Sequence, residues 1–96
     1  MALEVGESQY TLIQNDTGGA IDDAYLYRFK PDEYLLVVNA SNREKDVAHF
    51  KKHLTLFKDI EMIDRTFEVS MISLQGPLSK SIIQQIITRG TLPEPA

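Results

Sequence analysis

The first part of the chain alternates between apolar and polar side chains with the period of a β-strand. Residues 10–15 (YTLIQN) and 21–29 (IDDAYLYRF) follow this pattern, and the NDTGG between them tolerates the positive φ angles of a hairpin loop. The turn KPDE then leads into residues 34–39 (YLLVVN), whose apolar side chains on both faces are typical of a central strand. Three consecutive strands are therefore predicted.

The pattern then changes to helical spacing. Ser41 and Glu44 fit a capping box, in which each side chain pairs with the backbone N–H of the other residue, so a helix is predicted to start here. The buried stripe of this helix is predicted from side chains that recur at helical spacing: Val47, Phe50, Leu54 and Phe57.

The remaining pattern indicates more strands and a second helix. Residues 60–64 and 68–75 resemble two further strands. Gly76 and Pro77 are predicted to open the second helix, because proline suits the first helical position. Its apolar face is formed by Leu78, Ile82, Ile83, Ile86 and Ile87. The element order predicts a single small α+β domain, with a mostly antiparallel sheet of about five strands and two helices packed on one side.

Composition narrows the class of protein. The 96 residues, 43% hydrophobic and 25% charged, are typical of one soluble globular domain. The net charge of -4 argues against nucleic acid as a partner, since a phosphate-backbone binder needs clustered lysines and arginines. No cysteine is present, which excludes disulfides and thiolate metal sites. No apolar run approaches the roughly 20 residues of a membrane span, and the start lacks a signal-peptide pattern, so we expect a cytoplasmic protein without membrane contact.

Two small groups of residues could carry chemistry. Period two places Asp22 and Asp23 on opposite faces of their strand, with Asp23 on the face of Tyr25 and Tyr27. A carboxylate beside aromatic rings suits a flat, amine-bearing ligand, whereas acids at a strand entrance are also often simply solvated. Two histidines one helical turn apart, His49 and His53, have the spacing of metal ligands but no third ligand, so no metal site is predicted.

Three motifs together resemble a known family. The chain contains GG-x-x-DD-x-x-x-Y-R from Gly18, V-V-N-A-x-N-x-E-K-D from Val37, and Q-G-P from Gln75. This combination resembles the folate-binding segment of the aminomethyltransferase family, the T-protein of the glycine cleavage system, in register from about residue 10 to residue 87. Relatives with similar motifs include non-catalytic folate-binding proteins and the folate domains of dimethylglycine and sarcosine dehydrogenases, which remain alternatives.

The resemblance implies a function and a set of site residues. It implies a fragment of an enzyme that transfers the aminomethyl carbon from lipoylated H-protein to tetrahydrofolate with release of ammonia. Asp23 matches the catalytic carboxylate, and the folate-binding positions match Tyr10, Asp23, Tyr27, Val37 and Asn39. Core packing is an equal alternative for Tyr10 and Val37, and a turn or cap role is an alternative for Asn39.

The resemblance also divides the chain and orients one hairpin. Residues 1–9 are expected to be a linker, 10–88 a partial folate-binding domain and 89–96 a tail, with self-association through surfaces that absent domains would cover. The turn KPDE allows either of two registers between the second and third strands. Only one of them places Asp23, Tyr27, Val37 and Asn39 on one face, and the resemblance favours that one.

Overall fold

The structure is a computed structural model that describes residues 2–92. The chain divides into two compact units between Ile63 and Asp64, and each unit is described by itself. The first unit contains three strands, β1 (Ser8–Gln14), β2 (Ala20–Lys30) and β3 (Glu33–Val38), followed by a short 3-10 helix η1 (Ala40–Asn42) and the helix α1 (Arg43–Leu54). The second unit contains the helix α2 (Ser79–Ile86).

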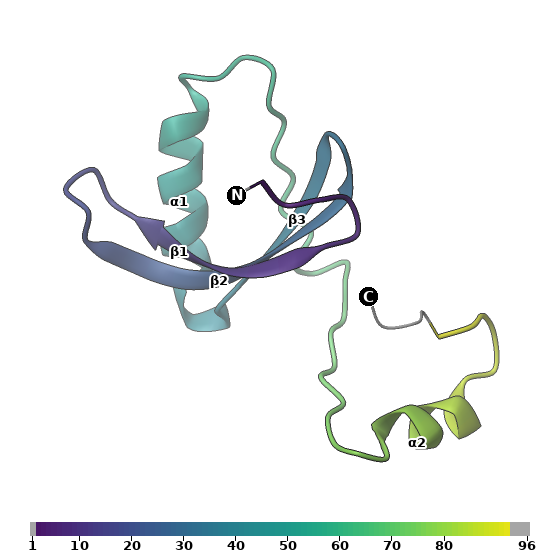
Figure 1. The fold of residues 1–96 in the computed structure, drawn as a ribbon. Helices are drawn as coiled ribbons and strands as arrows, with labels where there is room; N and C mark the ends of the chain where they lie inside the picture. Colours follow the sequence, from purple (N-terminus) through teal and green to yellow (C-terminus); the bar gives the residue numbers. More distant parts are fainter. Residues whose placement is uncertain (1, 93–96) are drawn as a thin grey trace. The chain divides into compact units, whose positions relative to one another are not determined.

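The three strands form an antiparallel sheet in the order β1-β2-β3, as Figure 1 shows. The loop between β1 and β2 is stabilised by Asn15, whose side-chain oxygen accepts from the backbone N–H of Thr17 at 3.1 Å and of Gly19 at 2.7 Å. Gly18 in the same loop has a φ of 86°, a conformation that glycine adopts without steric cost. The prediction of a positive φ angle in this loop is therefore confirmed.

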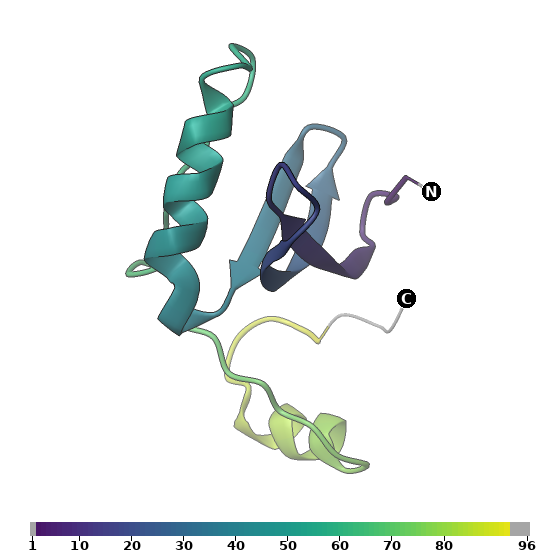
Figure 2. The ribbon, with the colours of Figure 1, turned by 90° about the vertical axis from the view of Figure 1, so that its left-hand side faces the viewer.

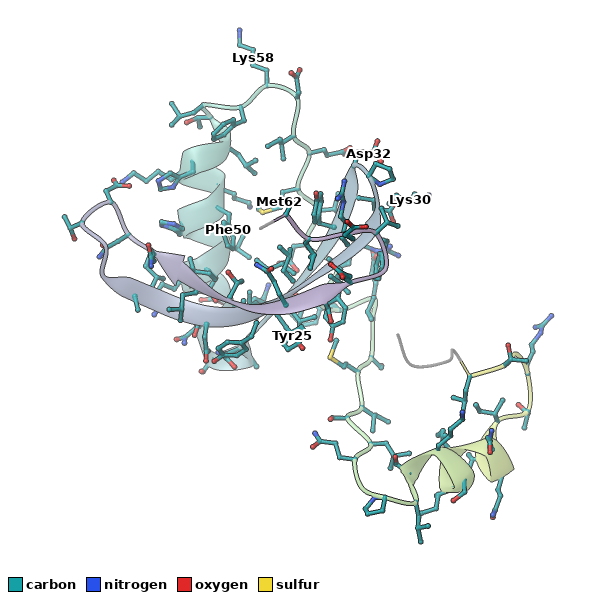
Figure 3. The ribbon with its side chains drawn as sticks, viewed as in Figure 1. Tyr25, Lys30, Asp32, Phe50, Lys58 and Met62 are labelled. Atoms are coloured by element: carbon teal, nitrogen blue, oxygen red, sulfur yellow. The ribbon has the colours of Figure 1, made fainter. Side chains whose placement is uncertain are left out.

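One face of the sheet packs against α1 (Figure 2). Ile13 of β1 and Ala24 of β2 are the buried apolar residues of the described chain, and both point to this face. Leu26, Leu36 and Phe50 are half-buried beside them and line the same groove between sheet and helix. Figure 3 shows Phe50 on the α1 side of the sheet and Tyr25 on the other side, which we call the outer face.

Two β-bulges set the register of the sheet. In the β2–β3 hairpin, Tyr25 pairs with Val37 and Tyr27 with Leu35, while Phe29 is an extra residue between Arg28 and Lys30. This is the register that the resemblance favours, so that prediction is confirmed. On the other side of β2, Ile13 pairs with Asp22 and Gln14 with Ala20, which makes Ile21 a second extra residue.

The small α+β class is confirmed, but the fourth and fifth strands are not. Within the described residues, 60–64 and 68–75 form no strand. A strand requires a partner for its backbone N–H and C=O groups, and the sheet of the described residues consists of β1, β2 and β3. Ile60, Glu61 and Met62, together with Phe57, instead line a groove beside α1 and β3. Apolar side chains of 64–75 are largely exposed, with Phe67 at 89% and Ile72 at 90%.

The predicted helix starts were also wrong in detail. Ser41 is not an N-cap, because it lies inside η1, and neither η1 nor α1 has a side-chain cap hydrogen bond. The extended residue before η1 is Asn39, whose amide is engaged elsewhere. Helix α2 begins at Ser79, two residues after Pro77. Phe57 lies beyond the end of α1 and is 55% exposed.

Neither helix in the described part of the chain has the length and apolar content that a membrane crossing requires.

Neighbouring residues Ile13 and Leu12 test the assignment of the two faces. Ile13 is 6% exposed under α1, whereas Leu12 is 56% exposed on the outer face. We expect Ile13→Ala to lower the free energy of unfolding by roughly 2–4 kcal/mol, because it leaves a cavity in a small core. Leu12→Ala should cost less than about 1 kcal/mol. Urea unfolding of both variants measures the difference, and equal losses would contradict the assignment.

Candidate functional site

A row of aromatic rings occupies the outer face of the sheet. Tyr10 of β1 lies edge-on to Tyr25 of β2 with ring centroids 6.3 Å apart, and Tyr25 is tilted against Tyr27 at 5.3 Å. Phe29, the extra residue of the bulge, continues the row at 6.5 Å from Tyr27. Tyr10 is 62% exposed and Tyr25 is 39% exposed. Exposed rings side by side form a surface on which a flat ligand can pack.

A carboxylate lies at the end of this row. Asp23 is two residues before Tyr25 on β2 and therefore shares its face. Its Oδ1 accepts a hydrogen bond of 2.6 Å from Nδ2 of Asn39, the residue that follows β3. Because side chains alternate between the two faces along both strands, the acid and the amide meet beside the aromatic row.

The amide of Asn39 also joins the two neighbouring carboxylates. Its Nδ2 donates to Asp22 Oδ1 at 2.9 Å as well as to Asp23 Oδ1. An amide nitrogen between two acceptor oxygens is the only stable orientation here, since the amide oxygen would be repelled by both carboxylates. Asn39 therefore spans the two faces at the end of the sheet.

The bulge at Ile21 is held by the start of α1. Asn42 Nδ2 donates to Asp22 Oδ1 at 3.0 Å, and Lys45 Nζ donates to the Ile21 carbonyl at 2.8 Å. A bulge leaves its extra residue outside the regular ladder, so a side-chain donor can reach its carbonyl. These contacts fix the backbone of β2 directly before Asp22 and Asp23, and with it the directions of the two side chains.

The charge of the site is set by hydrogen bonds. The hydrogen bond from the Asp46 carboxyl, together with that from Asn39, lowers the pKa of Asp22 to about 2. Burial, and then the neighbouring Asp22 carboxylate, raise the pKa of Asp46 to about 6. Between about pH 2 and about pH 6, Asp22 is therefore ionised while Asp46 keeps its proton.

The structure brings the five predicted site residues to one region. Tyr10, Asp23, Tyr27 and Val37 lie on the outer face by strand register, and Asn39 continues from β3 beside Asp23. Tyr27 and Val37 are half-buried and Tyr10 is exposed, so Tyr10 is not a core residue of the described chain. Asn39 does occupy the cap position before η1, but its side chain makes no cap hydrogen bond and binds the carboxylates instead.

Sequence reasoning missed three residues around this site: Asp22 as a hydrogen-bonded acid, Asn42 as its donor and Asp46 as its buried partner. A signal for Asp46 was present in the pattern. It precedes Phe50 by four residues, so it lies on the buried stripe of the helix, where an acid is rare.

The two histidines have a structural role. His53 Nδ1 lies 2.9 Å from the His49 carbonyl oxygen, and His53 Nε2 lies 3.3 Å from Asp16 Oδ1. The His49 carbonyl, and then Asp16, raise the pKa of His53, because both ring nitrogens have acceptors. His53 therefore connects the end of α1 to the β1–β2 loop. No cluster of three or more metal-ligating side chains occurs in residues 2–92.

The chemistry of the site fits an amine-bearing ring ligand. The exposed tyrosines offer a packing surface, and the Asp23 carboxylate at its end can accept a proton or stabilise a positive charge. On the outer face, no described residue buries Tyr10 or Tyr25. The ring surface is therefore accessible.

Comparison with known proteins gives a family and several relatives. The family model described as the GCVT N-terminal domain matches residues 1–94. An aminomethyltransferase of Chlorobium limicola is 43% identical over 81 residues, which cover 84% of this chain and 22% of that protein. The aminomethyltransferase of Prosthecochloris aestuarii is 42% identical over 88 residues, 92% of this chain and 24% of that protein. The aminomethyltransferase of Thermus thermophilus is 40% identical over 85 residues, which cover 88% of this chain and 24% of that protein.

The chain thus spans about a quarter of the length of the curated relatives it matches. No solved structure shows a significant match to it.

Replacing Asn39 tests the hydrogen bonds of the carboxylates. In Asn39→Leu we expect the pKa of Asp22 to rise from about 2 toward 3.8, since the second-largest of the contacts that lower it is lost. Asn42→Leu is the matched control and should raise it less, because the Asn42 contact contributes least. Carboxyl-carbon NMR titration of the aspartates measures both values. An equal rise of the Asp22 pKa in the two variants would contradict the conclusion that Asn39 is the stronger donor to Asp22.

Proposed function

This chain belongs to the GCVT N-terminal domain family, and we propose that its outer sheet face is the tetrahydrofolate-binding part of an aminomethyltransferase. The observation that carries the proposal is the meeting of Asp23 and Asn39 at the end of the row Tyr10, Tyr25 and Tyr27, on a face that α1 leaves open. The relatives named aminomethyltransferase match over this whole region.

Each group in the row has a proposed task. The tyrosine rings pack against the flat ring system, and Val37, which pairs with Tyr25 across the sheet, fills the space beside them. Tetrahydrofolate supplies the amine that accepts the one-carbon group. Asp23 faces that amine, where its carboxylate stabilises developing positive charge and can take up the amine proton.

Asn39 holds the Asp23 carboxylate in place. Its 2.6 Å hydrogen bond fixes Oδ1 of Asp23, which leaves the other carboxylate oxygen to the substrate. A preorganised carboxylate stabilises a cationic transition state better than a mobile one, because no reorganisation is needed during the reaction. The donor of the aminomethyl carbon in this proposal is a lipoylated H-protein, which binds in the intact enzyme.

Asp23→Asn tests the proposed catalytic carboxylate. The test uses a chimera in which this chain replaces the matching segment of the full-length Thermus thermophilus aminomethyltransferase. The two segments are 40% identical. In this chimera Asp23→Asn should lower the rate of aminomethyl transfer by on the order of 10², since the amide keeps the size but removes the charge.

The control for this experiment is Asp32→Asn in the exposed β2–β3 turn, which should leave the rate unchanged. Equal rates for Asp23→Asn and the control would rule out the proposed role of Asp23. Tetrahydrofolate binding without transfer in the unmutated chimera would favour a non-catalytic folate-binding relative instead.

The chain alone should be inactive in transfer. The aromatic row is open on the outer face, and Tyr10 remains 62% exposed, so the described residues form only one wall around a ring ligand. We expect no ammonia release when the 96-residue chain is mixed with aminomethylated H-protein and tetrahydrofolate, whereas a full-length relative under the same conditions releases it. Turnover by the chain alone would show that one wall is sufficient.

A further inference from the structure

One acid of the described chain is completely buried without a donor. Asp46 of α1 is 0% exposed, and neither of its carboxylate oxygens receives an N–H or O–H from the described residues. Oδ2 of Asp22 is likewise buried and receives no N–H from the described residues. The carboxyls of Asp22 and Asp46 are neighbours at the buried side of the sheet, near enough for each to shift the pKa of the other. Two ionised carboxylates side by side would repel each other, so this arrangement favours a proton between them up to about pH 6.

We propose that Asp46 carries this proton and donates a hydrogen bond to the ionised Asp22, and that this acid pair acts through Asn39 to position Asp23. Asp46 is a positioning residue here, since it belongs to α1 and is buried on the side of the sheet opposite to the aromatic row. The role in positioning a catalytic group rests on the proposed function, whereas the shared proton does not.

The surroundings decide which carboxyl is protonated. Asp22 accepts from Asn39 at 2.9 Å and from Asn42 at 3.0 Å through Oδ1, and N–H donors favour the ionised form. Asp46 has no such donor and is fully buried, which favours the neutral acid. The directions of the two pKa values agree with this assignment, because that of Asp46 is raised to about 6 and that of Asp22 is lowered to about 2.

The proton on Asp46 has a consequence for Asn39. It allows Asp22 to remain ionised next to a second acid, and an ionised Asp22 requires the NH₂ group of Asn39 to face it. The same NH₂ group donates to Asp23 Oδ1 at 2.6 Å. Four side chains in series thus connect the core to the outer face: Asp46, Asp22, Asn39 and Asp23.

Two charged groups act on the Asp46 carboxyl. Asp22 of β2 raises its pKa, and Lys45 of α1 lowers it. The ammonium group of Lys45 donates to the Ile21 carbonyl at 2.8 Å, so its charge is held at the bulge of β2. The neutral groups at this end of the sheet are Asn39 and Asn42, both of which donate to Asp22.

The test uses carboxyl-carbon and side-chain amide NMR on the 96-residue chain, without any folate. We expect one buried aspartate to titrate near pH 6, and this titration to disappear in Asp46→Asn, whose amide can still donate to Asp22. The Asn39 NH₂ signals should stay as in the unmutated chain. In Asp46→Leu the donor is lost, so the pKa of Asp22 should rise and the Asn39 signals should shift. Glu44→Gln, an exposed acid on the same helix, is the matched control and should change neither.

The pH dependence of stability gives a second readout. The pKa of Asp46 is about 6 in the fold and 3.8 ordinarily, so the fold binds this proton more tightly than the unfolded chain does. The free energy of unfolding should therefore fall as pH rises from about 4 through about 6, and Asp46→Asn should remove this slope. The Asp46→Asn variant should also be at least as stable as the unmutated chain at pH 7.

Three results would overturn the proposal: titration of Asp46 in its ordinary range, no response of Asn39 to Asp46→Leu, or a pH slope that Asp46→Asn leaves unchanged. If Asp46→Leu does not fold, Asp46→Asn still decides through its titration and its slope. Since neither readout involves tetrahydrofolate, failure here is distinct from failure of the Asp23→Asn transfer experiment.

Discussion

Backbone pairing along β2 determines the place of every candidate functional side chain. The bulge at Phe29 lets Tyr25 pair with Val37, and a shift of one residue would turn Val37 and the following Asn39 toward α1. The second bulge, at Ile21, lies directly before Asp22 and Asp23 and is held by Lys45. Both irregularities thus occur at the ends of the strand that carries the acids, where bulges commonly redirect side chains at functional sites.

The sheet separates two environments that the acids connect. On the α1 side, Ile13 and Ala24 form a very small buried core, which also contains the completely buried Asp46. On the outer face, exposed tyrosines lie beside Asp23. A buried acid is costly in so small a core, and this one lies beside Asp22, which Asn39 links to Asp23. Stability and positioning therefore depend on the same few contacts.

Several apolar side chains of the second unit are not buried by the described residues. Its apolar residues Phe67 and Ile72 are almost fully exposed, although the pattern of residues 68–75, which include Ile72, predicts a strand. The curated relatives are about four times as long as the segment they share with this chain. Apolar side chains are buried only when other elements pack against them, so local pattern alone does not bury these residues.

Much of the first unit follows from the sequence itself. Period-two alternation placed Asp23 with Tyr25 and Tyr27, and the glycines of the loop set the first hairpin, because these are local properties of the backbone. The motifs identified the family. Other features depended on contacts between distant residues. The turn chemistry allowed both registers of the β2–β3 hairpin, residues 60–64 and 68–75 lacked a partner strand, and Asn39 bound two carboxylates instead of capping a helix. The raised pKa of Asp46 was decided by tertiary structure alone, since only packing α1 onto the sheet removes its carboxyl from water and brings it close to Asp22.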